Sequence, residues 1–453
     1  MATFRPPQRC QPAGHPLNER PLSTALRPSA CPGLLRIVQA LDGGICRIKL
    51  NGGSITADQA DAVANAAEGF ARGEIEATNR ANLQIRGIGE QSAVLIDRLL
   101  AAGLGPQTAV GDDVRNLMLS PSAGIDRRLL FDTRPLAEQI LLTLQTHPRF
   151  PELSAKFAVQ LDGGEALAML AHPHDLWLSA FERDGEVMLA FGLAGCPTDR
   201  AAGAVTLENG HALVVAVLEL FLERARPEQT RMRHLLDEWP MPAFLEQLRE
   251  RVAIKAVVAR QRTPLAEALH IGVHPQNAAD RVYVGAVPAL GRLDPVMLRG
   301  AARLAREYGD GSLRFTPWQS LLLPNVKPSD AAHVLQTLTQ LHWLTDAREP
   351  LSRLIACTGS SGCGKGLADT KHDARWLATL LPQAQNVHLS GCPRSCAAAH
   401  CAPATLLAIS PGHYDLYFRD AALPGFGTLH ARNLTIEAAA ILLDARSRSP
   451  LDA

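Results

Sequence analysis

The sequence has no excess of charge of either sign and no long hydrophobic run. Lysine plus arginine and aspartate plus glutamate both number 45 in 453 residues, so the overall charge attracts the chain neither to nucleic acid nor to an anionic membrane. The most apolar stretch, HALVVAVLELFL at 211–222, is broken by Glu219 and is shorter than the ~20 residues of a membrane helix. We expect a buried helix there, no nucleic-acid partner and no membrane partner.

Signals for secretion and for nucleotide binding are also missing. Residues 1–40 lack an apolar core with a cleavage site, so we expect an N-terminal arm rather than a secretory signal. Nine unevenly placed cysteines in so long a chain do not suggest a disulfide framework. A reducing cytoplasmic location is expected, which would keep thiolates free to bind metal. No G-x-G-x-x-G follows a strand, and GCGKG at 362–366 lacks the spacing of a phosphate-binding loop.

A repeat divides the chain into two halves. The chain exceeds the usual size of one hydrophobic core, and residues 53–85 align without a gap with residues 291–323, at an offset of 238. Both segments show a helix cap, apolar residues at helical spacing, a glycine-containing turn and an alternating strand. The caps are Thr56 with Gln59, a capping-box pattern, and Asp294 before Pro295.

The same offset extends the repeat beyond these segments. It places Arg115 on Arg353, and residues 153–158 on residues 391–396, so that Lys156 falls on Arg394. We therefore predict an α/β (α+β) protein of two pseudo-symmetric halves, with a ligand-binding cleft between them. Each half is a small unit followed by a larger α/β domain. The expected boundaries are 41–110 and 111–225 for the first half, 226–277 for a polar linker, and 278–345 and 346–453 for the second half.

Four cysteines form the strongest motif, C-x5-C followed by C-x3-C, at Cys357, Cys363, Cys392 and Cys396. Structural zinc sites use cysteine pairs spaced two to four residues apart, so the first gap is too long for one. Glycines around the cysteines would let the backbone wrap a bulkier iron–sulfur cubane, with Lys365 and Arg394 offsetting its negative charge. Zinc and unliganded thiols remain the alternatives.

The other five cysteines have no comparable pattern. Cys46, Cys196 and Cys401 are expected to be buried apolar residues, whereas Cys10 and Cys31 lie in the arm, where no assignment is made.

The cysteine spacing in two pseudo-symmetric halves resembles that of the nitrite and sulfite reductase superfamily. The resemblance extends from about residue 28 to the C-terminus. It implies a ferredoxin-like half-domain before each α/β domain, and a [4Fe-4S] cluster against a siroheme with the last cysteine bridging both. It also implies basic residues for an anionic substrate and for the macrocycle's carboxylates. Arg80 in TNRANLQIRG, Arg115 in VRNLMLSP and Lys156 in LSAKFAV are the predicted catalytic residues.

One departure favours a particular branch of the superfamily. The reductases commonly carry a second lysine where this chain has Ala158, and RPSACPGLLR, DGGICRIKLNGG and TNRANLQIRG resemble the precorrin-3B synthase branch. In that branch the tetrapyrrole is the substrate. Precorrin-3A is hydroxylated with dioxygen, and an acetate side chain closes a lactone to give precorrin-3B. The alternatives are a ferredoxin-dependent nitrite or sulfite reductase with siroheme, and a non-catalytic electron-transfer or tetrapyrrole-carrying protein.

Further site residues and partners follow from this branch. Arg86, Gln319 in TPWQSLLLP, and Arg394 are predicted to bind the substrate, although Arg86 could equally be solvated on its strand. The cluster would supply single electrons to dioxygen. It would draw them from NADH through a ferredoxin or flavin reductase.

The resemblance also implies a mononuclear non-haem iron. His172-Pro-His174-Asp175 has a composition suited to such an ion, but adjacent residues rarely all face one metal. We expect a surface turn there and leave it outside the predicted site.

Overall fold

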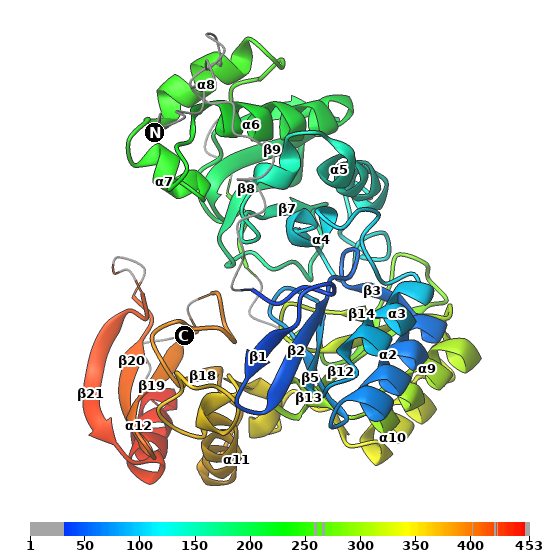
Figure 1. The fold of residues 1–453 in the computed structure, drawn as a ribbon, viewed down its shortest axis with the longest axis vertical. Helices are drawn as coiled ribbons and strands as arrows, with labels where there is room; N and C mark the ends of the chain where they lie inside the picture. The colour runs from blue at the N-terminus through cyan, green and yellow to red at the C-terminus, as the bar shows by residue number, and fades with distance from the viewer. Residues whose placement is uncertain are drawn as a thin grey trace, which may run out of the picture.

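The computed structural model describes residues 31–257, 261–264, 268–400, 402–420, 423 and 425–448. Figure 1 shows three lobes: the paired half-domains in blue and yellow-green, an α/β domain in cyan and green, and a C-terminal α/β domain in orange and red. Among the described residues, none of the helices combines the length and apolarity needed to cross a bilayer. Because 1–30 lie outside this range, the predicted arm is described only at 31–40, where Val38–Ala40 forms strand β1.

The two half-domains repeat each other element by element. Thr56 and Gln59 form the expected capping box, and the Asp294 side chain caps the second helix ahead of Pro295. A strand and a further strand follow each helix at the same offset of 238. The pairs are α2 (Ala57–Phe70) with α9 (Pro295–Tyr308), β4 (Glu74–Ala77) with β14 (Ser312–Phe315), and β5 (Leu83–Ile88) with β15 (Leu321–Val326).

Unusual backbone conformations recur at the same offset. A positive φ is accessible mainly to glycine and is uncommon elsewhere, so its recurrence is a demanding test of the duplication. Ala81 and Gln319, neither of them glycine, have φ of 55° and 61°. The other pairs are Gly52 with Leu290, Gly53 with Gly291, Gly73 with Gly311, and Gly87 with Asn325. The repeat predicted from the sequence is therefore confirmed in the backbone.

The half-domains exchange strands and share one hydrophobic core. Each sheet ends on a short strand from the other half. Strand β13 (Arg292–Leu293) pairs with β4, and strand β3 (Ser54–Thr56) pairs with β14. Helices α2 and α9 pack against each other, and α3 (Ser92–Ala101) and α10 (Ala331–Gln340) complete the layer (Figure 1). The sheet orders are β1-β2-β5-β4-β13 and β11-β12-β15-β14-β3. The strands not yet given bounds are β2 (Gly43–Ile48), β11 (Gly272–Pro275) and β12 (Val282–Pro288). An additional short strand, β16 (Trp343–Leu344), pairs with β12.

The two α/β domains share one strand pattern. In each sheet the first three strands are parallel and the last two are antiparallel. The first sheet contains β6 (Leu117–Leu119), β7 (Val159–Asp162), β8 (His174–Arg183), β9 (Glu186–Gly195) and β10 (Gly203–Thr206); the second contains β17 (Leu354–Ala356), β18 (Val387–Ser390), β19 (Ala404–Ser410), β20 (His413–Phe418) and β21 (Thr428–Leu434).

Helices cover these sheets. The first domain has α4 (Gly111–Val114), α5 (Arg134–Thr146), α6 (Gly210–Arg224), α7 (Met232–Leu236) and α8 (Met241–Arg249), and the second has α11 (Thr370–Leu380) and α12 (Ile436–Ser447). The apolar run at 211–222 lies in α6, whose inner face is buried as expected.

Two expectations about organisation need correction. The segment 153–158 precedes β7, whereas 391–396 follows β18, so the offset of 238 does not relate them and Lys156 is not the counterpart of Arg394. The segment 226–277 is also more than a polar linker. It contains α7 and α8, which bury Met232, Phe244 and Leu248 in the core of the first α/β domain.

Candidate functional site

The four cysteines lie in two loops at one edge of the C-terminal sheet. Cys357 follows β17, and Cys392 and Cys396 follow β18. These neighbouring strands are parallel, so their carboxyl ends bring the two loops together. The Gly391 N–H donates to Cys357 Sγ at 3.2 Å, and the Leu367 N–H donates to the Gly391 carbonyl at 2.9 Å. The fold thus joins sequence segments about 30 residues apart.

The other three thiols of the motif lie within electrostatic reach of Cys396. Desolvation raises the pKa of the Cys396 thiol, and Cys392, Cys357 and Cys363 raise it further. Four thiols on two adjoining loops are the donor set that a four-iron cluster takes. The residues present therefore fit an iron–sulfur cluster, which would supply one-electron transfer.

Glycines allow the cysteine loops to pack this closely. Gly359 has a φ of 69°, and a Cβ there would lie 2.5 Å from the Ala368 carbonyl oxygen. A Cβ at Gly366 would lie 2.5 Å from the Gly359 carbonyl carbon, and one at Gly391 would lie 3.4 Å from Cys357 Sγ. Side chains at the first two positions would push the loops apart.

Each half-domain donates one hydrogen bond to the loop of the last cysteine. Asn79 Nδ2 donates to the Cys396 carbonyl at 3.2 Å. Gln319 Nε2 donates to the Ala397 carbonyl at 3.1 Å. Gln319, predicted to bind the substrate, therefore lies beside Cys396 and orients its loop.

Arginines gather where the three lobes meet. Burial lowers the pKa of Arg80 to about 10, and repulsion from Arg47 and Arg231 lowers it further. Arg47 in turn lies within electrostatic reach of Cys396. Arg231 is held by Asp175 at 2.9 Å, and Arg47 donates to the neutral Gln84 amide at 2.8 Å. Among the described residues, neither Arg47 nor Arg80 forms an ion pair.

The other two predicted catalytic residues, Arg115 and Lys156, differ in burial. Arg115 is buried and lies 3.5 Å from Asp112, and it donates to the Gly105 carbonyl at 3.3 Å. It therefore supports α4 locally. The Lys156 side chain is exposed on the loop before β7. Their catalytic roles stay predictions.

Arg86 is neither solvated nor free to bind a ligand. Its guanidinium contacts Asp42 at 2.8 Å and Glu76 at 3.6 Å, and it reaches the Gly362 carbonyl at 3.5 Å. The alternative that Arg86 is solvated is therefore wrong. Its guanidinium pairs with the Asp42 and Glu76 carboxylates next to the first cysteine loop. Arg394 and Lys365 are both exposed; Arg394 lies close enough to Cys396 to lower its pKa.

The expected surface turn at His172–Asp175 is wrong. His172, His174 and Asp175 are each 2% exposed. Asp175 accepts from the amides of Ala158 and Met232 at 2.9 Å. Burial lowers the pKa of His174 to about 3, and the Arg80 charge adds to that shift. Both imidazoles are therefore neutral at pH 7, and His172 Nδ1 has no hydrogen-bond partner among the described residues.

Comparison with known proteins shows the family. The model described as "Nitrite/Sulfite reductase ferredoxin-like half domain" matches residues 38–103 and 274–341, and that described as "Nitrite and sulphite reductase 4Fe-4S domain" matches residues 110–256. Ferredoxin–nitrite reductase of Synechococcus elongatus is 31% identical over 78% of this chain and 73% of the relative. The chain belongs to the nitrite and sulfite reductase family.

Other relatives in this family carry different names. Precorrin-3B synthase of a Sinorhizobium species is 29% identical over 88% of this chain and 84% of the relative. The structure of the Mycobacterium tuberculosis NirA protein aligns with a TM-score of 0.75 at 20% identity, covering 90% of this chain and 82% of that one. That likeness confirms the predicted two-half α/β fold with ferredoxin-like half-domains.

The 4Fe-4S domain match of this family falls on the first α/β domain, yet the four cysteines lie in the second. Counting from the strand ends, Ser120 and Asp126 follow β6 as Cys357 and Cys363 follow β17. The Asp126 carboxylate accepts from Ser122 Oγ at 2.8 Å and from the Ala166 N–H at 3.1 Å. A carboxylate thus joins the two loops in the first copy, where thiols meet in the second.

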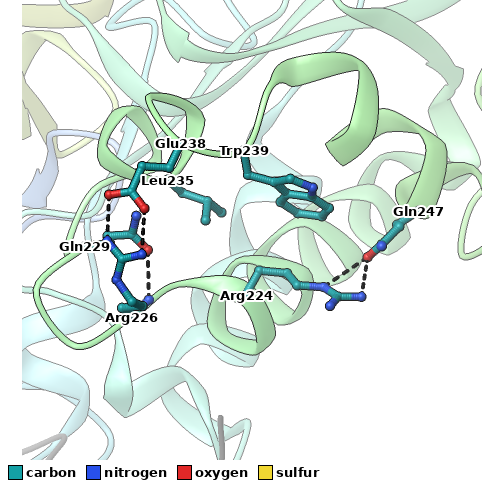
Figure 2. A pocket seen from close by; sticks show the side chains of 7 residues that line it. All are labelled: Arg224, Arg226, Gln229, Leu235, Glu238, Trp239 and Gln247. Atoms are coloured by element: carbon teal, nitrogen blue, oxygen red, sulfur yellow. Dashed lines mark hydrogen bonds and ion pairs between the residues drawn. The ribbon is translucent and has the colours of Figure 1, made fainter. Parts of the chain in front are cut away.

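A cavity of about 280 Å³ lies elsewhere, between α6 and α8. Figure 2 shows its lining, in which Arg224 turns to Gln247 and Arg226 to Glu238. These side chains satisfy one another. Figure 1 places α6 and α8 at the far end of the first α/β domain from the cysteine loops, so the cavity is not part of the cluster site.

Three basic residues near the site were missed by the sequence reasoning: Arg47, Arg231 and Lys371. Arg47 lies inside a quoted motif, DGGICRIKLNGG, where its strand position could have signalled it; the other two carried no local signal. Of the remaining cysteines, Cys46 and Cys196 are buried as predicted, Cys31 is half-buried, and Cys10 and Cys401 lie outside the described residues.

Proposed function

We propose that this iron–sulfur oxidoreductase binds a polycarboxylate tetrapyrrole as its substrate where the three lobes meet, and that it hydroxylates precorrin-3A with dioxygen to give precorrin-3B. The observation that carries the proposal is the cationic junction. Arg47 lies within electrostatic reach of both Arg80 and Cys396, and neither arginine has an ion-pair partner among the described residues.

Like charges held together in a partly desolvated place repel each other, and Asp175, whose carboxylate acts on Arg80, is already paired with Arg231. A ligand with several carboxylates would supply a counter-charge. Each guanidinium can grip one carboxylate through two parallel hydrogen bonds. Gln319 and Asn79, which fix the Cys396 loop, would keep the cluster beside the macrocycle.

Two observations favour a substrate tetrapyrrole over a bound siroheme. Where the reductases commonly carry a second lysine, Ala158 is 5% exposed and its amide is bonded to Asp175, so a cation for a small anion is missing. The precorrin-3B synthase relative also aligns over a larger share of both chains than the nitrite reductase of Synechococcus elongatus does.

The proposed reaction takes two electrons from outside the chain. One oxygen atom of dioxygen enters the substrate, and the other leaves as water with two protons. NADH, through a ferredoxin or flavin reductase, is the proposed source of the electrons.

The first experiment is anaerobic purification, an absorption and EPR spectrum, and acid–acetone extraction. A reducible four-iron cluster without siroheme, followed by NADH-dependent dioxygen uptake with precorrin-3A, is the expected result. Siroheme at about one per chain, with nitrite or sulfite reduction, would overturn the proposal in favour of the reductase.

Restoring the second lysine provides a further test. We expect Ala158→Lys to lower kcat/KM for precorrin-3A about tenfold, because it adds a cation beside Asp175 and disturbs its pairing with Arg231. Ala101→Lys, at an exposed site on α3, is the matched control. Equal activity of both variants would show that position 158 does not shape the binding site.

A further inference from the structure

A buried lysine lies behind the first cysteine loop. Lys371, in the first turn of α11, is 5% exposed. Its Nζ donates to the Leu290 carbonyl at 2.6 Å and the Ala356 carbonyl at 3.3 Å, and it lies 3.7 Å from Glu76 Oε1. An ammonium has three donors, so these three acceptors match its capacity. Ala356 directly precedes Cys357, which places the charge against the backbone of a predicted ligand.

The carboxylate partner comes from a different lobe. Glu76 lies on β4 of the half-domain and also contacts Arg292 at 3.1 Å and Arg86 at 3.6 Å. Thr358, the residue after Cys357, donates its hydroxyl to the same carboxylate at 3.3 Å. Burial alone would raise the pKa of Glu76, but Lys371, Arg86 and Arg292 together lower it. The carboxylate is therefore ionised, and Lys371 and Glu76 form a buried ion pair across the domain contact.

We propose that the Lys371–Glu76 ion pair sets the reduction potential of the cluster, with Lys371 raising it and Glu76 lowering it. The inference rests on the cluster assignment to Cys357, Cys363, Cys392 and Cys396, and does not depend on which substrate is bound. Lys371 acts as a positioning residue that supplies charge and touches neither substrate nor reacting atoms.

The physical reason is the field of a fixed charge in a desolvated place. Reduction adds one negative charge to the cluster, and a nearby cation stabilises that added charge more strongly where water is excluded. Burial lowers the pKa of Lys371, whereas Glu76 and the Cys357 thiol, both within electrostatic reach, raise it. The carbonyls of Leu290 and Ala356 accept from its Nζ and so favour the charged ammonium. Lys365 is closer to Cys363 in sequence but is exposed, so solvent and salt screen its charge.

The test is an EPR-monitored redox titration of the anaerobically purified holoprotein without substrate. We expect Lys371→Met to make reduction of the cluster at least tenfold less favourable, a shift of about 59 mV to more negative potential for one electron. Glu76→Gln should shift the potential in the opposite direction. Lys365→Met is the matched control, with a smaller shift.

Shifts of opposite sign in Lys371→Met and Glu76→Gln would show an effect of charge. Loosened packing at this contact would instead shift the reduction potential of both variants in the same direction. The proposal is overturned if Lys371→Met shifts the potential no more than Lys365→Met, or if Lys371→Met and Glu76→Gln shift it in the same direction. If Lys371→Met does not retain iron, the sign for Glu76→Gln decides. Because no tetrapyrrole is present, these outcomes leave the proposed substrate untouched.

Discussion

Arg80 and Arg86 belong to one ten-residue motif and differ in their surroundings. Arg86 lies between Asp42 and Glu76 of its own half-domain and reaches the Gly362 carbonyl of the C-terminal domain at 3.5 Å. Arg80 faces Arg47 and Arg231, and burial with this repulsion lowers its pKa to about 10. At the scale of single residues, the surrounding charges decide whether an arginine supports the fold or is available to a ligand.

Replacing Arg80 tests the cationic junction. We expect Arg80→Gln to weaken binding of a stable octacarboxylate porphyrin by about 2 kcal/mol, or roughly thirtyfold, because a charge-assisted pair is lost. Absorbance titration of the anaerobic protein measures this. Arg98→Gln, at an exposed position on α3, serves as the control, and equal affinities of the two variants would remove Arg80 from the binding site.

The predicted ligand set is tested at Cys396. We expect Cys396→Ser to lose most of its iron and sulfide, because three thiolates do not retain a cubane as four do. Burial raises the pKa of Cys196 to about 12, so this thiol stays protonated, and Cys196→Ala should keep its iron. Chemical analysis of iron and sulfide decides, and full content in Cys396→Ser would refute the assignment.

At the scale of elements, turns with positive φ position the cysteine loops. Ala81 and Gln319 occupy equivalent turns before β5 and β15, and the neighbouring Asn79 and Gln319 side chains hold Cys396 and Ala397. Duplicated local geometry thus delivers two hydrogen bonds to one loop of the second half.

Substitutions at Gly53 and Gly311 would distinguish the cost of backbone strain from the cost of steric overlap. Gly53 and Gly311 have φ of 80° and 77°, but a Cβ at Gly53 would lie 2.2 Å from the Phe315 carbonyl oxygen, and one at Gly311 would meet nothing within 4 Å. We expect Gly311→Ala to cost about 1 kcal/mol of unfolding free energy, and Gly53→Ala about 3 kcal/mol. Urea unfolding measures both, and equal costs would contradict the overlap between β3 and β14.

At the scale of the whole molecule, contact between the three lobes shifts the pKa values of side chains that the separate lobes contribute. His174 comes from the first α/β domain and Arg80 from a half-domain, and together with burial this charge lowers the His174 pKa to about 3. His172 responds to His400 of the C-terminal domain. Assembly therefore keeps the junction histidines neutral.

This depressed pKa predicts an acid-sensitive stability. Between pH 6.5, the ordinary histidine value, and about pH 3, the unfolded chain binds a proton at His174 that the folded chain does not. The contribution of His174 to the free energy of unfolding is therefore fully present above pH 6.5, and it decreases as the pH is lowered. From pH 7.5 to 5.5, wild type should lose about 1.4 kcal/mol more unfolding free energy than His174→Gln.

Urea unfolding at the two pH values measures this difference. His372→Gln, at an exposed position, is the control and should follow wild type. A parallel loss in wild type and His174→Gln would show that His174 is not held neutral by the junction.

Much of the architecture was predictable because it depends on local signals. Capping residues, helical spacing and glycine turns repeat at one offset in the half-domains, and local chemistry acts alike in both copies. The offset failed in the α/β domains because loop lengths between β6 and β7 and between β17 and β18 differ. The buried His172–Asp175 segment was missed because its polar composition resembles a turn, and its partner Arg231 lies 56 residues away.

The sequence by itself determined the duplication and the four-cysteine pattern, since both are written in residue types and their spacing. Only the tertiary structure decided which cations lie at the site. Arg47, Arg231 and Lys371 come from three different lobes, and Lys371 depends on Glu76 of another lobe for its partner. Electrostatic interaction acts through space between groups that the fold desolvates together, so chain position alone does not reveal it.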